Sequence, residues 1–426
     1  MSENVQKTLR DSAVLRWLAL ILLAGAMFCS YIFMDILSPI KDLMWDTKGW
    51  DSTAFGTMQG SETFLNVFVF FLIFAGIILD KMGVRFTAIL SGAVMLVGAT
   101  INWYALTDMF AGSNLEVWFN EHLNYIPGFD ELGVSPFYKG MPASAKFSAI
   151  GFMIFGCGVE MAGITVSRGI VKWFKGREMA LAMGSEMARA RLGVATCMIF
   201  SPMFARLGGE VSVSRSVAFG VVLLMIALIM FIVYAFMDKK LDSQTGEAEE
   251  KDDPFKLSDL GKILTDSGFW LVALLCVLYY SAIFPFQKYA VNMLQCNLVF
   301  HQVDPSSIWA SNTITIIQYV IMLVVAACAF ASNFSKNKVA KYGLMGAAIV
   351  ALVVFCYMGY MRQSAETVFA VFPLLAVGIT PILGNYVDHK GKAATMLVLG
   401  SLLLIACHLT FAFVLPAFKG SEVGGI

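Results

Sequence analysis

The sequence predicts an all-α polytopic membrane protein, and two observations carry this prediction. Hydrophobic residues make up 58% of the 426 residues and charged residues only 14%, whereas soluble domains carry about 25% charged residues. The hydrophobic residues also form long blocks, and blocks of about 20 apolar residues cross ~30 Å of hydrocarbon as helices. The formal net charge is zero, which gives no support to a nucleic-acid partner.

Eleven such blocks are predicted to be membrane-spanning helices. Lys and Arg are more frequent in the loops on the N-terminal side than in the opposite loops, which predicts a cytoplasmic N-terminus. With eleven spans the C-terminus would be external. The predicted spans cover residues 14–38, 57–79, 86–107, 145–170, 179–205, 214–237, 269–297, 306–331, 339–361, 365–387 and 393–416.

A charged segment after the sixth span divides the chain into two groups of helices. Within the first group, residues 108–144 are expected to be a long external loop that contains a short surface helix at 114–125. Within the second group, residues 306–361 are interpreted as an inserted helix pair, and the five spans leave the bundle incomplete, as in a truncated protein. The predicted parts are a six-helix bundle at 1–237, a cytoplasmic linker at 238–268 and a C-terminal bundle at 269–426.

One short motif lies between the second and third predicted spans. The run from Gly76 to Arg85 has the form G-x-x-x-D-K-x-G-x-R and includes Lys81. Gly76 would let two helices approach closely, Asp80 would accept hydrogen bonds from basic side chains, and Gly83 would permit a tight turn. The motif resembles the loop motif of the major facilitator superfamily, which implies a fold of two helical bundles and a transport function.

A second copy of this pattern lies in the C-terminal half, as expected of structural repeats. It follows the fourth span of that half rather than the second. For this reason the helix pair at 306–361 is interpreted as an insertion. The last three spans that a usual transporter of this superfamily would have are interpreted as absent. The matching residues are Gly384, Asp388, Lys390, Gly391 and Lys392.

Four further segments narrow the resemblance. They are G-C-G-V-E at 156–160, V-K-W-F-K-G-R-E at 171–178, M-A-R-A-R-L-G at 187–193 and L-Y-Y-S-A-I-F-P-F at 278–286. Together they resemble the group of major facilitator superfamily domain-containing protein one, which comprises the lysosomal dipeptide transporters and their bacterial relatives.

This resemblance implies a transporter of short peptides with binding residues on three of the spans. The acidic residue of the fourth span corresponds to Glu160, and the arginine of the fifth span to Arg191. Asp35 stands where the family carries an aspartate on the first span. On the seventh span, Tyr279 and Tyr280 are further candidates for contact with the solute.

The charges of Glu160 and Arg191 also stand out without the resemblance. A charged side chain in hydrocarbon costs about 2.5–3.5 kcal/mol on insertion scales, so it usually faces a partner or a wet cavity. At 1.5 Å per residue, Glu160 would lie ~15 Å and Arg191 ~18 Å from the cytoplasmic face. They could therefore form a structural ion pair, or they could line a cavity and bind the ammonium and carboxylate of a zwitterionic solute.

A second pair of charges lies on the fifth predicted span. Glu186 and Arg189 are three residues apart and share one helix face, which predicts a structural or gating pair. Arg189 and Arg191 point ~200° apart around the helix. Arg191 is therefore the residue expected to bind the solute.

Three functions are compatible with these observations. The first is a secondary active or facilitative transporter of dipeptides or short peptides, the second an organic-anion or sugar-acid porter that uses Arg191 alone, and the third a non-transporting membrane sensor or scaffold. The sequence has no metal-ligand spacing or catalytic motif, so no enzyme activity, cofactor or metal site is predicted. We expect a monomer in the plasma (inner) membrane, with the bilayer and a small solute as its partners.

Overall fold

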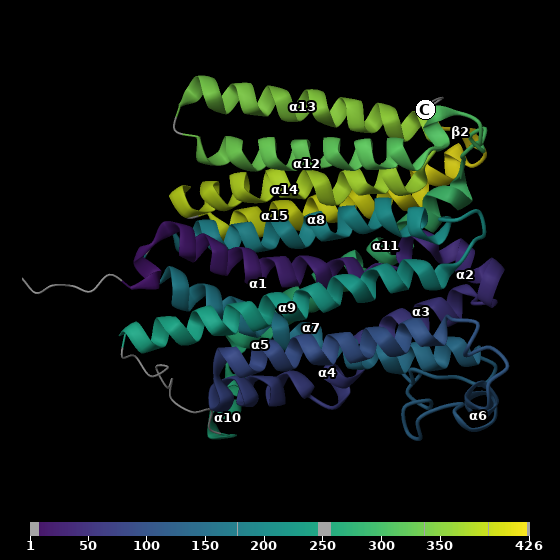
Figure 1. The fold of residues 1–426 in the computed structure, drawn as a ribbon, viewed down its shortest axis with the longest axis horizontal. Helices are drawn as coiled ribbons and strands as arrows, with labels where there is room; N and C mark the ends of the chain where they lie inside the picture. The colour runs from purple at the N-terminus through teal and green to yellow at the C-terminus, as the bar shows by residue number, and fades with distance from the viewer. Residues whose placement is uncertain (1–7, 177, 246–256, 336, 391, 424–426) are drawn as a thin grey trace, which may run out of the picture. The chain divides into compact units, whose positions relative to one another are not determined.

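A computed structural model describes residues 8–176, 178–245, 257–335, 337–390 and 392–423. Most of these residues are helical (Figure 1). They form two compact units, of which the first comprises Met1–Gly193 with Phe204–Pro254, and the second Val194–Met203 with Phe255–Ile426. The division after Pro254 falls inside the predicted linker 238–268, whose two ends are helical.

The first unit is a bundle of long apolar helices around α7. The helix α7 packs against α1, α3, α4, α5 and α6, while α9 packs against α1 and α5. The helices are α1 (Ala13–Met34), α2 (Lys41–Lys48), α3 (Ser52–Gly60), α4 (Phe64–Phe68), α5 (Phe71–Ala105), α6 (Asn114–His122), α7 (Ala143–Phe174), most of α8 (Met179–Ala205) and α9 (Val213–Thr245), with 3-10 turns at Leu9–Asp11, Ser38–Ile40 and Ser61–Thr63.

The second unit is also helical, and α12 packs against both α13 and α14. Its helices are α10 (Leu257–Thr265), α11 (Ser267–Asn297), α12 (Asn312–Phe334), α13 (Lys338–Met361), α14 (Ala365–Lys390) and α15 (Ala393–Leu409), followed by a π-helical turn (Thr410–Val414) and a 3-10 turn (Leu415–Phe418). Another 3-10 turn covers Ile308–Ala310, and the short strands β1 (Leu298–Val299) and β2 (Ser421–Glu422) pair in parallel.

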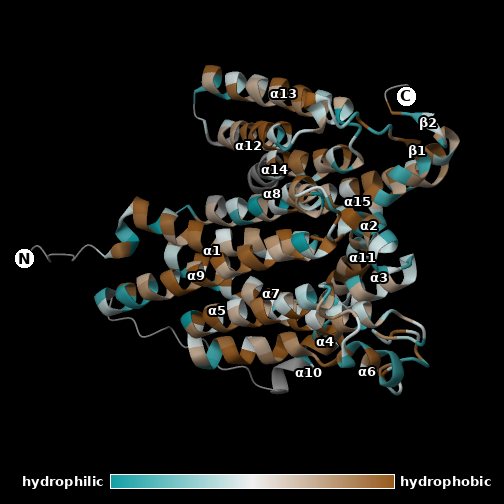
Figure 2. Cartoon of the chain, turned by 45° about the vertical axis from the view of Figure 1, so that its right-hand side comes forward, coloured by the Kyte–Doolittle hydropathy of each residue, from teal (hydrophilic) through white to brown (hydrophobic). Residues whose placement is uncertain are grey.

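The helices have the length and composition of membrane spans. In the described part of the chain, eight helical segments are long and apolar enough to cross a bilayer, and α14 adds a shorter apolar segment at Ala365–Thr380. Figure 2 shows hydrophobic residues along these helices, with hydrophilic residues at α6 and at one end of α9. The prediction of an all-α polytopic membrane protein is confirmed, while the count of eleven spans stays a prediction.

The predicted spans 57–79 and 86–107 meet at a kink, where two helical stretches join within α5. Helix α5 runs through the motif between them, and only Gly83 leaves the helical conformation, with φ 78° and ψ 170°. Among the amino acids, this conformation is essentially restricted to glycine. Gly83 therefore provides the predicted change of chain direction as a sharp kink.

Close contact between helices occurs at α5 and α7 rather than at Gly76. A Cβ on Gly98 would contact the backbone N of Phe155 and would lie 2.5 Å from the carbonyl O of Gly151. A Cβ on Gly151 would likewise lie 2.6 Å from the carbonyl O of Gly98. At Gly76 the same addition meets no atom within 4 Å, so the close approach expected at this glycine was wrong.

The loop 108–144, which the sequence predicts to be external, is a folded cap over one end of α7. The short helix expected at 114–125 is confirmed as α6. Lys146 of α7 is only 1% exposed, and its Nζ donates to the backbone O of Phe119 at 3.1 Å and to Asn124 Oδ1 at 3.2 Å. Phe147 stacks on Phe110 with ring centroids 5.4 Å apart, so apolar packing supports the polar attachment.

A second polar attachment joins the cap to the chain before α3. The hydroxyl of Tyr138 donates to Asp51 Oδ1 at 3.3 Å. Burial and the negative charge of Asp51 raise the pKa of Tyr138 to about 12. The hydroxyl therefore keeps its proton, and the hydrogen bond is preserved at physiological pH.

Candidate functional site

Helix α7 is buried along most of its surface but leaves one stripe open in its C-terminal half. Glu160 is exposed on this stripe, together with half-buried Gly163 and Ser167 and exposed Val171. These residues are three, seven and eleven positions after Glu160, so they share one face of the helix. A lipid-facing stripe would carry large apolar side chains. The glutamate, glycine and serine instead favour contact with water or a polar solute.

Arg191 occupies the corresponding place on α8. It lies twelve residues after the first residue of α8 (191 − 179), and Glu160 lies fourteen residues before the last residue of α7 (174 − 160). These separations correspond to ~18 Å and ~21 Å along the helix axes. Both charges therefore lie near the middle of their helices, and Arg191 is half-buried.

Neither charge is neutralised by a neighbouring side chain. Within the described ranges, no hydrogen bond or ion pair joins Glu160 or Arg191 to each other or to another residue. A structural ion pair that locks α7 to α8 is therefore not formed in this conformation. Charges at mid-helix need a compensating partner or water, and a bound zwitterion would supply both compensating charges.

The neighbouring Arg189 points away toward α1. Its guanidinium donates to the backbone O of Leu20 at 3.2 Å. Glu186 is buried, with 6% exposure, and no ion pair to Arg189 is formed in the described part of the chain. The structural or gating role of this pair stays a prediction. The contact of Arg189 with α1 agrees with the expected separation of Arg189 and Arg191 around the helix.

The other proposed solute contacts differ in their surroundings. Asp35 lies directly after α1 and is fully buried, and its Oδ1 accepts a hydrogen bond from Ser38 at 3.5 Å. Tyr279 and Tyr280 belong to α11 of the second unit, where they are 41% and 48% exposed. The ring of Tyr280 stacks on Phe284 at 5.0 Å. The role of these residues in solute binding stays a prediction.

The first motif copy is held by ion pairs with α7 and α9. Asp80 pairs with Arg168 of α7 at 2.5 Å, and Arg85 pairs with Asp242 of α9 at 2.6 Å. Lys81 is exposed. The acidic position of the motif thus accepts hydrogen bonds from a basic side chain, as the sequence predicts, and its gating role remains a hypothesis.

The second motif copy lies at the junction of α14 and α15. Gly384, Asp388 and Lys390 belong to the last turns of α14, and Lys392 is exposed directly before α15. Gly391 lies outside the described residues. Among the residues that the structure describes, no group of His, Cys, Asp or Glu side chains could hold a metal ion.

Sequence reasoning missed a buried carboxylate near the end of α9. Asp238 has 0% exposure and pairs with Lys172 at 2.7 Å, while Arg85 lies 3.9 Å away. Trp173 Nε1 donates to Asp238 Oδ1 at 2.9 Å, and the hydroxyl of Tyr234 donates to the same atom at 3.2 Å. An aspartate that follows a long apolar block was the available signal, because such acids usually have a partner.

A family model and several curated proteins match this chain. The model described as Major Facilitator Superfamily matches residues 23–367. The lysosomal dipeptide transporter MFSD1 of Gallus gallus is 29% identical over 145 residues, which cover 32% of this chain and 32% of that protein. The Homo sapiens protein of the same name is 24% identical over 280 residues, covering 64% and 52%. The chain thus spans about a third to a half of the length of these relatives.

Solved structures of membrane transporters resemble the chain at low sequence identity. A bacterial homologue of the human drug peptide transporters PepT1 and PepT2 is 12% identical with a TM-score of 0.45, covering 92% of this chain and 99% of that chain. The xylose transporter XylE from E. coli is 10% identical with a TM-score of 0.43, covering 89% and 99%.

Proposed function

Because the chain belongs to the Major Facilitator Superfamily, whose members transport small solutes across membranes, we propose that it transports dipeptides or other short zwitterionic peptides by alternating access. The observation that carries this proposal is the placement of Glu160 and Arg191. They have opposite charges, lie at mid-helix and are not ion-paired within the described part of the chain. The relatives named lysosomal dipeptide transporters support the same solute class.

The two charges suit the two ends of a short peptide. The planar guanidinium of Arg191 can bind a carboxylate through two parallel hydrogen bonds. The carboxylate of Glu160 can accept hydrogen bonds from an ammonium group. Their fixed separation would select for peptide length, while side chains of the peptide would face less specific walls. We propose Asp35 as a further contributor to this site, and Tyr279 and Tyr280 as solute contacts provided by the second unit.

Neutralising either charge is expected to abolish most of the transport. Glu160→Gln and Arg191→Ala should each reduce dipeptide counterflow in proteoliposomes at least about tenfold, because a hydrogen bond to a charged group contributes about 1.5–3 kcal/mol. Glu121→Gln and Arg206→Ala change exposed charges outside the proposed site and should transport normally. Normal transport by both site variants would disprove the assignment.

Capped peptides assign each end of the solute to one residue. An N-acetyl dipeptide lacks the ammonium, so it should compete only weakly with a dipeptide for transport. This weak competition should be the same in the wild type and in Glu160→Gln. A dipeptide amide lacks the carboxylate, so it should also compete weakly. Its competition should be the same in the wild type and in Arg191→Ala. If organic anions without an ammonium compete as well as dipeptides do, the chain is an organic-anion porter instead.

We also propose that the protein resides in the plasma (inner) membrane with a cytoplasmic N-terminus. The excess of Lys and Arg in one set of loops supports this orientation. A cysteine introduced at Ser12, which lies directly before α1, should react in intact cells only with a membrane-permeant maleimide. Labelling by an impermeant maleimide would reverse the orientation.

A further inference from the structure

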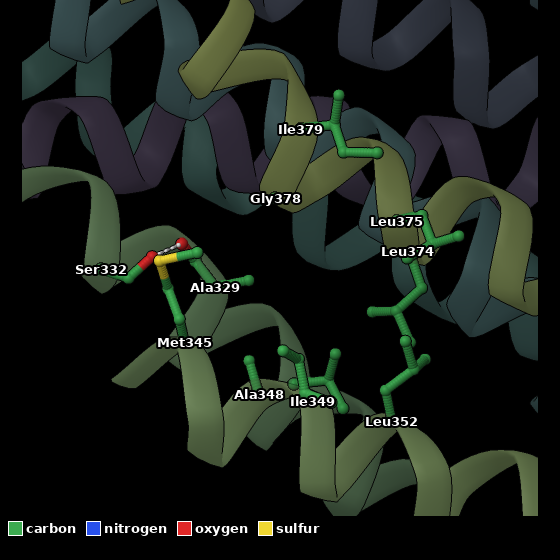
Figure 3. Close-up of a pocket in the computed structure, with 11 residues that line it drawn as sticks. Ala329, Ser332, Met345, Ala348, Ile349, Leu352, Leu374, Leu375, Gly378 and Ile379 are labelled. Atoms are coloured by element: carbon green, nitrogen blue, oxygen red, sulfur yellow. Dashed lines mark hydrogen bonds between the residues drawn. The ribbon is translucent and has the colours of Figure 1, made fainter. Parts of the chain in front are cut away.

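We propose that a pocket formed by α12, α13 and α14 binds one acyl chain of an anionic phospholipid, whose headgroup contacts Lys338 and Lys341. The pocket lies within the second unit and has a volume of about 160 Å³. Figure 3 shows Ser332 and Met345 beside each other at one end of it. The lining residues include Ser332, Met345, Ala348, Ile349, Leu375 and Ile379.

The lining selects hydrocarbon over water or a polar solute. Ser332 carries the one side-chain hydroxyl among the lining residues, and it donates to the backbone O of Ala329 at 2.8 Å. Water needs at least two polar partners in a cavity, whereas an apolar cavity of ~150 Å³ in another protein stays dry and binds benzene. The pocket therefore has space for a short run of methylene groups.

The pocket is continuous with an exposed apolar surface of α13 and α14. Both α12 and α13 are candidate membrane spans, and Ile349, Leu375 and Ile379 of the lining are 60%, 42% and 47% exposed. Val350 and Val353 of α13 extend this exposed apolar surface. Lipid chains surround such a surface in a membrane, so an acyl chain can enter the open side of the pocket.

Two lysines extend the pocket toward the membrane surface. Lys341 lies four residues before Met345 and seven before Ala348, so all three share one face of α13. Lys338 is one further turn away at the start of the helix. Neither lysine forms an ion pair with a residue that the structure describes. Basic side chains at the cytoplasmic ends of spans bind anionic headgroups, which favours an anionic lipid over a neutral one.

A photoactivatable lipid tests this proposal on the full chain. The probe is phosphatidylglycerol with a diazirine in the middle of one acyl chain, diluted into phosphatidylethanolamine vesicles that contain the purified protein. We expect adducts to concentrate on peptides that contain Met345, Ile349 and Leu375. Ala348→Leu should lower the adduct yield there at least about tenfold, because its added carbon atoms occupy the space of buried methylene groups.

Matched variants separate loss of the site from loss of folding. Gly346→Leu adds a side chain on the same helix where no atom lies within 4 Å, so its adduct yield should equal that of the wild type. Lys338→Gln and Lys341→Gln should each lower phosphatidylglycerol labelling about fivefold without changing the labelling by a phosphatidylcholine probe. All variants are compared at equal amounts of monodisperse protein.

Three results would overturn the proposal. The first is labelling spread evenly over the exposed faces of α13 and α14. The second is unchanged labelling in Ala348→Leu protein that is monodisperse. The third is crosslinking of these peptides between two copies of the chain, which would assign the pocket to a dimer contact.

Discussion

Replacing Asp238 with alanine is expected to destabilise the first unit by about 3–5 kcal/mol, because it leaves the buried donors of Trp173 and Tyr234 without their acceptor and removes an ion-pair partner of Lys172. Asp238 is fully buried and accepts from Lys172, Trp173 and Tyr234. Without this carboxylate, the ammonium of Lys172 would keep only its ion pair with Asp242. The midpoint of thermal unfolding in detergent, followed by size-exclusion chromatography, measures the effect.

Asp242 provides the matched control for this experiment. It lies four residues later on α9 and also pairs with Lys172 and Arg85, but its side chain is 15% exposed. Asp242→Ala should therefore lower the unfolding midpoint clearly less than Asp238→Ala. Asp238→Asn keeps an acceptor and should fall between the two. If all three variants unfold at the same midpoint as the wild type, the buried network does not stabilise the fold.

Replacing Gly98 with leucine is expected to prevent normal packing of α5 against α7. A side chain at this position meets backbone atoms of Gly151 and Phe155, and backbone cannot rotate away as the end of a flexible side chain can. Overpacking commonly lowers the free energy of unfolding by about 1–3 kcal/mol. We expect Gly98→Leu to lower it by an amount at or above the upper end of this range. The fraction of monodisperse protein after solubilisation is the measurement.

Gly76→Leu is the control on the same helix. An added side chain there meets no atom within 4 Å, so the amount of monodisperse protein should match that of the wild type. The opposite ranking, with Gly76→Leu aggregated and Gly98→Leu folded, would contradict the helix contacts described above. The same pair of variants tests the close helix contact that the sequence predicts at Gly76.

The features that depend on composition and local pattern could be predicted from the sequence. Long apolar blocks sufficed for the helical membrane class, and the mixed polar and apolar segment after residue 113 was correctly expected to contain the helix α6. Gly83 was recognisable because a motif glycine with charged neighbours is typical of a change in chain direction. In each case the deciding information lies within one continuous stretch of the chain.

The features that were missed depend on contacts between distant parts of the chain. Gly76 and Gly98 are both glycines in apolar helices, and only the path of α7 makes one of them a contact point. The carboxylate of Asp238 gains its importance from Lys172 and Arg85, which are 66 and 153 positions away along the chain (238 − 172 and 238 − 85). Without neighbouring helices in view, sequence alone ranked Glu160 and Arg191 above Asp238.

The attachment of the 108–144 cap by Lys146 has a practical consequence for observing the transport cycle. Lys146 belongs to the same helix as Glu160 and is anchored in the cap through Phe119 and Asn124. A dye coupled to a cysteine at exposed Asn120 would therefore travel with α7 as a single body. Such a label offers an optical record of how this helix tilts during turnover, taken at the cap and without touching the proposed binding residues.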